Sequence, residues 1–363
     1  MFQLTPNGLL DAFCMIAVYL LAIYNYACMK DRKRGTGFFF FVVFITLFSL
    51  FYRPEGGDFW NYLEAYRLGV DNPYHHMEDF YYWLMSLIPN NYLLWRVSIW
   101  LPTAIIICII FKIMKIPSNN ATTFFLLLAL TNAFYYTRNA LALSVLYLAL
   151  IIFCVRDYVV KKTLNTVLFI ALTFASWYLH KSMPIYILLA LMAIILPFNK
   201  KYILASLIAF PLLYGVILIL TTNFVGIAQL WLMEDAGDLY LEGENLFAAN
   251  WKGVVSLIVG YLPIVYFYLI AFRHPLSKEN PEFQSYKTFL LLSFFLFYIS
   301  FLFLGQGSIA IQGRLYKSSM MPMAFVVCLF FKNNWGSKEC RYFIYLMVLK
   351  ITFSFIVGTA SSI

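Results

Sequence analysis

Long apolar runs, separated by short polar or basic connections, alternate along almost the whole chain. A helix of about 20 apolar residues spans the roughly 30 Å hydrocarbon core of a bilayer, because each residue adds about 1.5 Å. By this criterion the sequence predicts twelve membrane-spanning helices, over residues 9–29, 37–52, 92–111, 117–135, 139–155, 163–178, 183–198, 202–224, 252–272, 288–304, 319–331 and 342–358. We therefore expect an all-α, polytopic membrane protein that forms one domain over residues 1–363.

The composition agrees with this interpretation. Charged residues make up 12% of the chain and the hydrophobic set 63%, whereas a soluble fold carries about 25% charged residues. The 37 Phe, 27 Tyr and 8 Trp residues suit lipid-facing helices and interfacial belts. No Cys or His spacing is typical of a metal site, so we expect neither a metal nor a cofactor.

The formal charge of +9 needs to be sorted by membrane side before it is interpreted. If the amino terminus lies outside, the predicted cytoplasmic connections carry 17 of the 26 basic residues, and the outer ones carry eight. This distribution follows the positive-inside rule, so the charge gives no reason to expect nucleic acid binding. Both termini and three long connections, residues 53–91, 225–251 and 305–318, are then expected outside.

The basic residues expected outside are enriched in Arg. Five of these eight are Arg, whereas 12 of the 17 expected inside are Lys. A guanidinium can bind a phosphate with two parallel hydrogen bonds, and an ammonium cannot. Arg138 is expected at the amino end of a helix, where the dipole favours an anion, and Arg314 closes a Gly-rich stretch. Snorkelling of these side chains at the interface is the alternative explanation.

Three side chains are candidates for proton transfer. Asp58 follows a Gly-Gly turn and is expected to begin a short helix that presents Tyr62 and Tyr66 on one face. Glu78 precedes a short apolar segment, and His180 lies in a tight turn between two spanning helices. The alternatives are that Asp58 only caps an amphipathic helix on the bilayer and that His180 is a hydrogen-bonded structural residue. The acidic segment 225–250 is expected to be a solvated loop, or to contact sugar hydroxyls or a cation.

Several of these positions together resemble a known family. The matching fragments are Gly56-Gly57-Asp58 with Tyr62, Glu78 with Phe80-Tyr81 and Leu84, Arg138 with Ala142, His180-Lys181-Ser182, and the late Arg314. In this order and spacing they resemble the EpsG family, a branch of the Wzy-type bacterial polysaccharide polymerases. The chain departs from the family pattern twice: Asp79-Phe80 replaces Pro-Gly, and Asn139 replaces Gln.

The resemblance implies a GT-C-like glycosyltransferase in the bacterial plasma membrane, with its active site on the periplasmic or extracellular side. Its partners would be the lipid bilayer and undecaprenyl-diphosphate-linked oligosaccharides as donor and acceptor. A chain-length regulator protein is left open. We expect Asp58 to be the base that activates the acceptor hydroxyl, followed in order by Glu78 and His180, with the carboxylate pKa raised by burial. The expected substrate-binding and diphosphate-binding residues are Arg53, Tyr62, Arg138, Lys181, Arg314 and Lys317.

Three other activities stay open at this point. The first is a GT-C enzyme that adds a single sugar from a lipid monophosphate, and the second is a flippase for lipid-linked oligosaccharides. A transporter usually places its charges near the bilayer midplane, whereas here only Lys350 is expected there. The third is a membrane acyltransferase, for which His180 is the one candidate catalyst.

Overall fold

The computed structural model describes residues 6–28, 36–52, 59–68, 77–130, 137–155, 162–199, 201, 205, 251–302, 309–332 and 334–361. All the regular secondary structure in these segments is helical. The long helices are α1 (Pro6–Ala27), α2 (Phe38–Phe51), α5 (Tyr92–Ile113), α8 (Thr137–Cys154), α10 (Lys162–Leu179), α11 (Met183–Ile195), α15 (Trp251–Arg273), α16 (Phe283–Leu302), α17 (Ile309–Phe331) and α18 (Lys338–Ser361). The shorter elements are α3 (Phe59–Leu68), α4 (Asp79–Leu87) and α6 (Ser118–Phe125), which continues into a π-helical turn, η3 (Leu126–Leu130).

Helices occupy eleven of the twelve predicted spans, and the eighth span, residues 202–224, lies outside the described residues apart from residue 205. By length and composition, three of the described helices could cross a bilayer, at Leu10–Ala27, Tyr92–Ile113 and Thr137–Cys154. Four shorter apolar helices accompany them, at Phe38–Phe51, Thr163–Leu179, Met183–Ile195 and Ile258–Arg273. The described part of the chain is thus all-α and includes membrane-capable helices, and the count of twelve spans remains a prediction.

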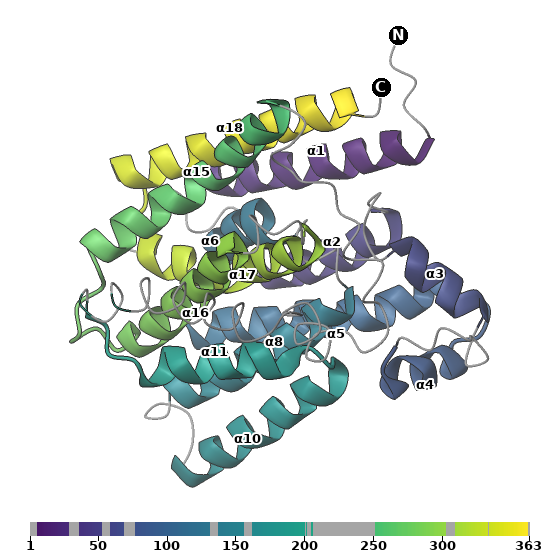
Figure 1. The fold of residues 1–363 in the computed structure, drawn as a ribbon, viewed down its shortest axis with the longest axis horizontal. Helices are drawn as coiled ribbons and strands as arrows, with labels where there is room; N and C mark the ends of the chain where they lie inside the picture. The colour runs from purple at the N-terminus through teal and green to yellow at the C-terminus, as the bar shows by residue number, and fades with distance from the viewer. Residues whose placement is uncertain are drawn as a thin grey trace, which may run out of the picture.

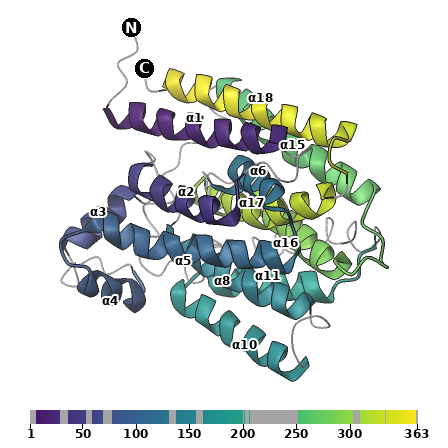
Figure 2. The same ribbon diagram turned by 180° about the vertical axis from the view of Figure 1, so that it is seen from behind.

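The long helices run roughly side by side (Figures 1 and 2). Helix α16 packs along α17, α10 along α8, and α15 along α18, while α5 contacts both α2 and α8. Helix α1 begins and α18 ends on the same side of this bundle, and α3 and α4 also lie there, at the right in Figure 1. We call this side the α3–α4 end.

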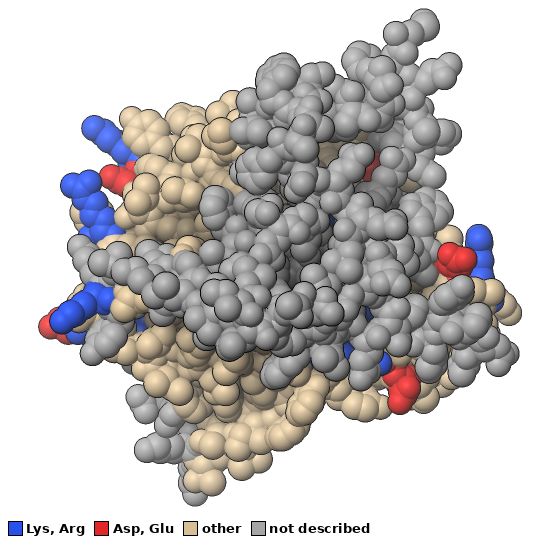
Figure 3. Space-filling model, viewed as in Figure 1, with Lys and Arg blue, Asp and Glu red and all other residues tan. Residues whose placement is uncertain are grey.

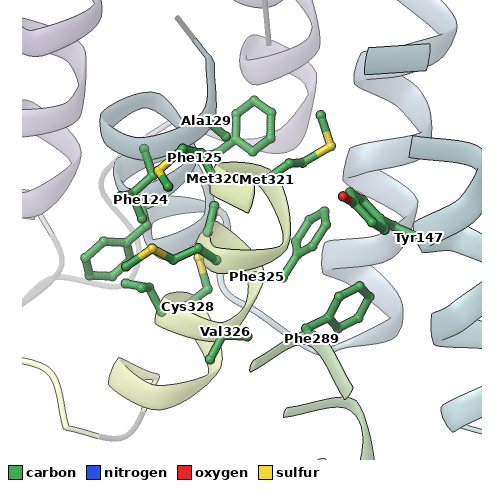
Figure 4. Close-up of a cluster of buried hydrophobic side chains, with 14 of the residues drawn as sticks. Phe124, Phe125, Ala129, Tyr147, Phe289, Met320, Met321, Phe325, Val326 and Cys328 are labelled. Atoms are coloured by element: carbon green, nitrogen blue, oxygen red, sulfur yellow. The ribbon is translucent and has the colours of Figure 1, made fainter. Parts of the chain in front are cut away.

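The centre of the bundle is filled by apolar and aromatic side chains. Figure 4 shows α6, η3, α8, α16 and α17 contributing to one buried cluster. Within it, the Phe325 ring lies 5.3 Å from that of Phe289 and 6.0 Å from that of Tyr147, measured between centroids. Such edge-to-face and tilted aromatic contacts add to the free energy gained by burial.

The periphery is also apolar, as expected for contact with lipid. Along α10, large apolar side chains are exposed, including Val167, Ile170, Phe174 and Trp177. Contiguous exposed apolar surface of this kind marks an interface with lipid or protein. On the face drawn in Figure 3, the coloured charged side chains lie mostly toward the left and right edges, the two ends of the helices.

A second, smaller apolar cluster holds α3 and α4 against α5. Its members are Phe59, Tyr62, Met77, Tyr81, Tyr82, Met85, Tyr92, Trp95, Ile99 and Leu141. Beside it, the buried Arg96 of α5 donates from Nη1 to the carbonyl of Tyr52 at 3.1 Å and lies 4.6 Å from the Phe59 ring centre. Tyr52 is the C-cap of α2, so a cation here also complements the negative end of that helix dipole. The two short helices are therefore fixed to the bundle.

Helix α17 begins earlier than the sequence predicts. Residues 305–318 were expected to form a connection, but α17 begins at Ile309 and contains Arg314. A single Gly inside a helix costs only about 1 kcal/mol relative to Ala, so Gly313 does not end the helix when its neighbours pack well. Arg314 thus projects from a helix, not from a flexible loop.

Candidate active site

A buried ion pair between Arg138 and Glu78 is the centre of the candidate site. Glu78 is the N-cap residue of α4, and Arg138 is the second residue of α8. Arg138 Nη1 lies 2.6 Å from Glu78 Oε2, and the two side chains are 14% and 8% exposed. Because both charges are largely removed from water, losing one partner would leave a costly uncompensated charge.

Tyrosines from α3 and α4 orient the Arg138 side chain. Its Nε donates to the Tyr62 hydroxyl at 3.1 Å, and its guanidinium carbon lies 5.0 Å from the Tyr62 ring centre and 5.8 Å from that of Tyr81. The Tyr81 hydroxyl also donates to the Arg138 carbonyl at 3.2 Å. The short helices thus hold the guanidinium through hydrogen bonds and cation–π contacts.

Glu78 is further held by the turn between α10 and α11. The backbone N–H of Lys181 donates to Glu78 Oε1 at 3.1 Å. Burial raises the pKa of the Glu78 carboxyl, but the Arg138 guanidinium and this N–H lower it more, so the net pKa lies below the ordinary value. The raised carboxylate pKa expected from the sequence is therefore not found at Glu78, because an ion pair offsets the burial.

His180 is a buried, neutral imidazole. Its Nδ1 accepts a hydrogen bond from the Ser182 N–H at 3.1 Å and lies 2.9 Å from the Ser182 hydroxyl and 3.9 Å from Glu78 Oε1. Burial lowers its pKa, Glu78 raises it, and Arg138 and Arg314 lower it, so that the net pKa is about 3. Since Nδ1 accepts from a backbone N–H, Nε2 carries the proton, and His180 can donate a hydrogen bond but is a poor base.

Arg314 belongs to the same electrostatic environment. Its charge acts on His180 and also on the Tyr186 hydroxyl. One turn further along α17, the Ser318 hydroxyl accepts from Asn139 Nδ2 at 3.0 Å and lies 3.1 Å from the Tyr186 hydroxyl. Because Asn139 follows Arg138 in α8 and Ser318 follows Arg314 by four residues, this contact brings both arginines to one region.

Four helix segments meet here through their amino-terminal parts. Glu78 caps α4, Arg138 is the second residue of α8, Lys181 precedes the N-cap residue of α11, and Arg314 lies in the second turn of α17. The amino end of a helix carries partial positive charge and exposes free backbone N–H groups. Together with two guanidiniums and one carboxylate, these ends make a region suited to an anion.

Two of the remaining predicted site residues lie outside the described part of the chain, and two lie within it. Asp58 and Arg53 lie outside the described residues. The Lys181 side chain is exposed although its backbone binds Glu78, and Lys317 is partly buried on α17, three residues after Arg314. Among the described residues, no group of three His, Cys, Asp or Glu side chains could hold a metal ion.

Four contributors were missed by sequence reasoning. Tyr81 and Tyr186 lie within apolar runs, and Ser318 ends the connection predicted over residues 305–318. None of the three has a sequence signal that identifies its partner. Asn139 had a weak signal, because it directly follows Arg138 and occupies a position where the resembling family has Gln.

Comparison with known proteins gives a family but no individual relative. Curated proteins and solved structures yield no match to the chain. A family profile matches residues 36–362, which is nearly the whole chain and includes every residue of the candidate site. This agrees with the fragments around Asp58, Glu78, Arg138, His180 and Arg314 that carry the resemblance. The chain therefore belongs to the EpsG family of Wzy-type, polymerase-like membrane proteins.

Proposed function

We propose that the protein is a polysaccharide polymerase of the outer leaflet of a bacterial plasma membrane. It would transfer a growing glycan from undecaprenyl diphosphate to a sugar hydroxyl of a second lipid-linked repeat unit. The observation that carries this proposal is the Asn139–Ser318 hydrogen bond, which brings the start of α8, with Arg138, to the part of α17 that holds Arg314. Family membership supports a polymerase of this general kind.

Glycosyl transfer from a lipid diphosphate needs cations that bind the leaving group more than it needs a general acid. A lipid diphosphate is already a good leaving group, so the enzyme has to bind it and stabilise the charge that develops as the glycosidic bond breaks. Two guanidiniums at the amino ends of helices meet this need. Tyr62 orients one of them, and Lys181, Lys317 and Arg53 are proposed to add positive charge around the lipid phosphates.

His180 fits a role as a hydrogen-bond donor. With Nδ1 accepting from Ser182, its Nε2–H can donate to a phosphate or sugar oxygen. Its pKa of about 3 leaves it neutral at physiological pH. The base that activates the acceptor hydroxyl is then a carboxylate, with Asp58 and Glu78 as the candidates.

The test uses purified protein in lipid nanodiscs with undecaprenyl-diphosphate-linked repeat units. Arg138→Ala and Arg314→Ala should abolish the ladder of long products while single repeat units accumulate. Arg67→Ala is the matched control, because Arg67 is exposed on α3 and belongs to no part of the site. A normal ladder in both site variants would refute the proposal.

The same assay separates the alternatives. A single added sugar from a lipid monophosphate donor, in place of a ladder, would identify a GT-C glycosyltransferase that is not a polymerase. Movement of intact lipid-linked repeat units across the bilayer, with no new glycosidic bond, would identify a flippase.

A further inference from the structure

The ion pair of Glu78 with Arg138 places a carboxylate against the same guanidinium that the proposed function assigns to the diphosphate. We propose that the donor switches on its own base: when a diphosphate binds Arg138, it releases Glu78 from the field of that cation, and Glu78 then accepts the proton of the acceptor hydroxyl. This inference rests on the proposed function and describes how that same site is regulated.

The geometry lets one cation serve two anions in turn. Arg138 contacts Glu78 through Nη1 and Tyr62 through Nε. A guanidinium carries five N–H donors in a fixed fork, so a phosphate can approach it beside Glu78 or replace Glu78. In either case, the negative charge of the phosphate offsets the positive charge that Arg138 presents to Glu78.

The other groups around Glu78 do not replace this cation. From the α10–α11 turn, His180 Nδ1 lies 3.9 Å away but is neutral, and Lys181 contributes its backbone N–H while its side chain is exposed. The Tyr81 ring, which belongs to α4, is uncharged, and Arg314 of α17 acts on His180. Arg138 is therefore the principal charge that keeps the buried Glu78 ionised among the described residues.

The direction of the response follows from burial. Glu78 is 8% exposed, and its surroundings favour the protonated form once the cation is neutralised. Before the donor binds, the carboxylate is a weak base, because Arg138 lowers its pKa. After binding, the burial remains and a second anion is added nearby, so both effects raise the proton affinity of Glu78.

The transfer step then balances without a further reactant. The acceptor hydroxyl oxygen bonds to the anomeric carbon as the bond from that carbon to the diphosphate oxygen breaks. The electron pair leaves with undecaprenyl diphosphate, which Arg138 and Arg314 hold. The hydroxyl proton passes to the Glu78 carboxylate and later to water, and a positioned base of this kind typically contributes about 10²- to 10⁴-fold.

Infrared difference spectroscopy on the full-length protein in nanodiscs tests the switch. The pH is lowered from about 7 to about 3 with and without inorganic pyrophosphate, and the carbonyl stretch of protonated carboxylic acids is monitored. With pyrophosphate, we expect one such band to appear at a higher pH in the wild type; this shift should be missing in Glu78→Gln and should persist in Asp79→Asn. Asp79 is a matched control because it is the adjacent carboxylate and is exposed.

Isotope labelling keeps the test independent of whether the variants fold. Carbon-13-labelled glutamate should shift the band in the wild type, whereas labelled aspartate should not, which separates Glu78 from Asp58. If calorimetry shows pyrophosphate binding that requires Arg138 and Arg314 but the glutamic acid band appears at the same pH with and without pyrophosphate, the switch is refuted and the proposed function stands. If pyrophosphate does not bind, or binds without these arginines, both are refuted.

Discussion

Replacing Arg138 by Gln should reverse the pH dependence that Glu78 gives to the stability of the protein. In the wild type, the pKa of Glu78 in the folded state lies below the ordinary value of about 4.3. Its stabilising contribution is therefore complete above the unfolded-state pKa and is lost as the pH falls through the lower, folded-state value. In Arg138→Gln the burial of Glu78 remains without its cation, so the folded-state pKa moves above the unfolded-state value.

The stability of the variant then changes in the opposite direction. Arg138→Gln should be least affected below the unfolded-state pKa of Glu78 and should lose stability as the pH rises through the folded-state pKa. The size of the stability loss at neutral pH depends on how far the pair is buried. The Arg138 and Glu78 side chains are only 14% and 8% exposed, so we treat them as a buried pair. Breaking a buried pair by removing one partner costs about 3–5 kcal/mol.

The midpoint of thermal unfolding in detergent, followed by Trp fluorescence, measures this effect between about pH 4 and pH 8, a range that includes the ordinary carboxyl pKa. The double variant Arg138→Gln with Glu78→Gln is the control, since it removes both charges and should lose the pH dependence that the pair contributes. Arg138→Gln should be less stable than this double variant at neutral pH. A single variant whose midpoint still falls toward acid, as in the wild type, would refute the reasoning.

Three further results are expected. Asn139→Leu removes the donor to Ser318 and should cost about 1–3 kcal/mol while weakening pyrophosphate binding in calorimetry; unchanged binding would show that this contact does not set the position of Arg138. His180→Asn should lower the polymerisation rate without changing the shape of the pH–rate profile between about pH 5 and pH 8, because the His180 pKa is about 3. If the wild-type profile has a titration step in that range and the variant lacks it, this prediction is contradicted. Arg96→Leu leaves the Tyr52 carbonyl without its partner and should lower the thermal midpoint by the equivalent of about 1–3 kcal/mol, whereas product length stays normal; shortened products at full stability would assign Arg96 to the site.

Much of the fold could be predicted because the evidence for it is local. Apolar runs located eleven helices, and the turn at His180 and the start of α8 near Arg138 are where the sequence placed them. The predicted start of the helix over residues 319–331 was wrong, because a glycine and polar residues in the sequence do not reveal that α17 begins at Ile309, upstream of Arg314. The predicted direction of the Glu78 pKa shift was wrong, because its ion-pair partner could not be identified from the sequence.

The sequence by itself determined a membrane-embedded helical protein with arginines and carboxylates gathered in particular segments. These properties depend on residues that are neighbours along the chain, and helix formation and partition into lipid act at that range. The tertiary structure decided which of them meet: Glu78 contacts Arg138 across 60 positions and Lys181 across 103, and Asn139 contacts Ser318 across 179. Such distant contacts are set by how the helices pack, and that packing made Glu78 the partner of Arg138 and His180 a neutral donor.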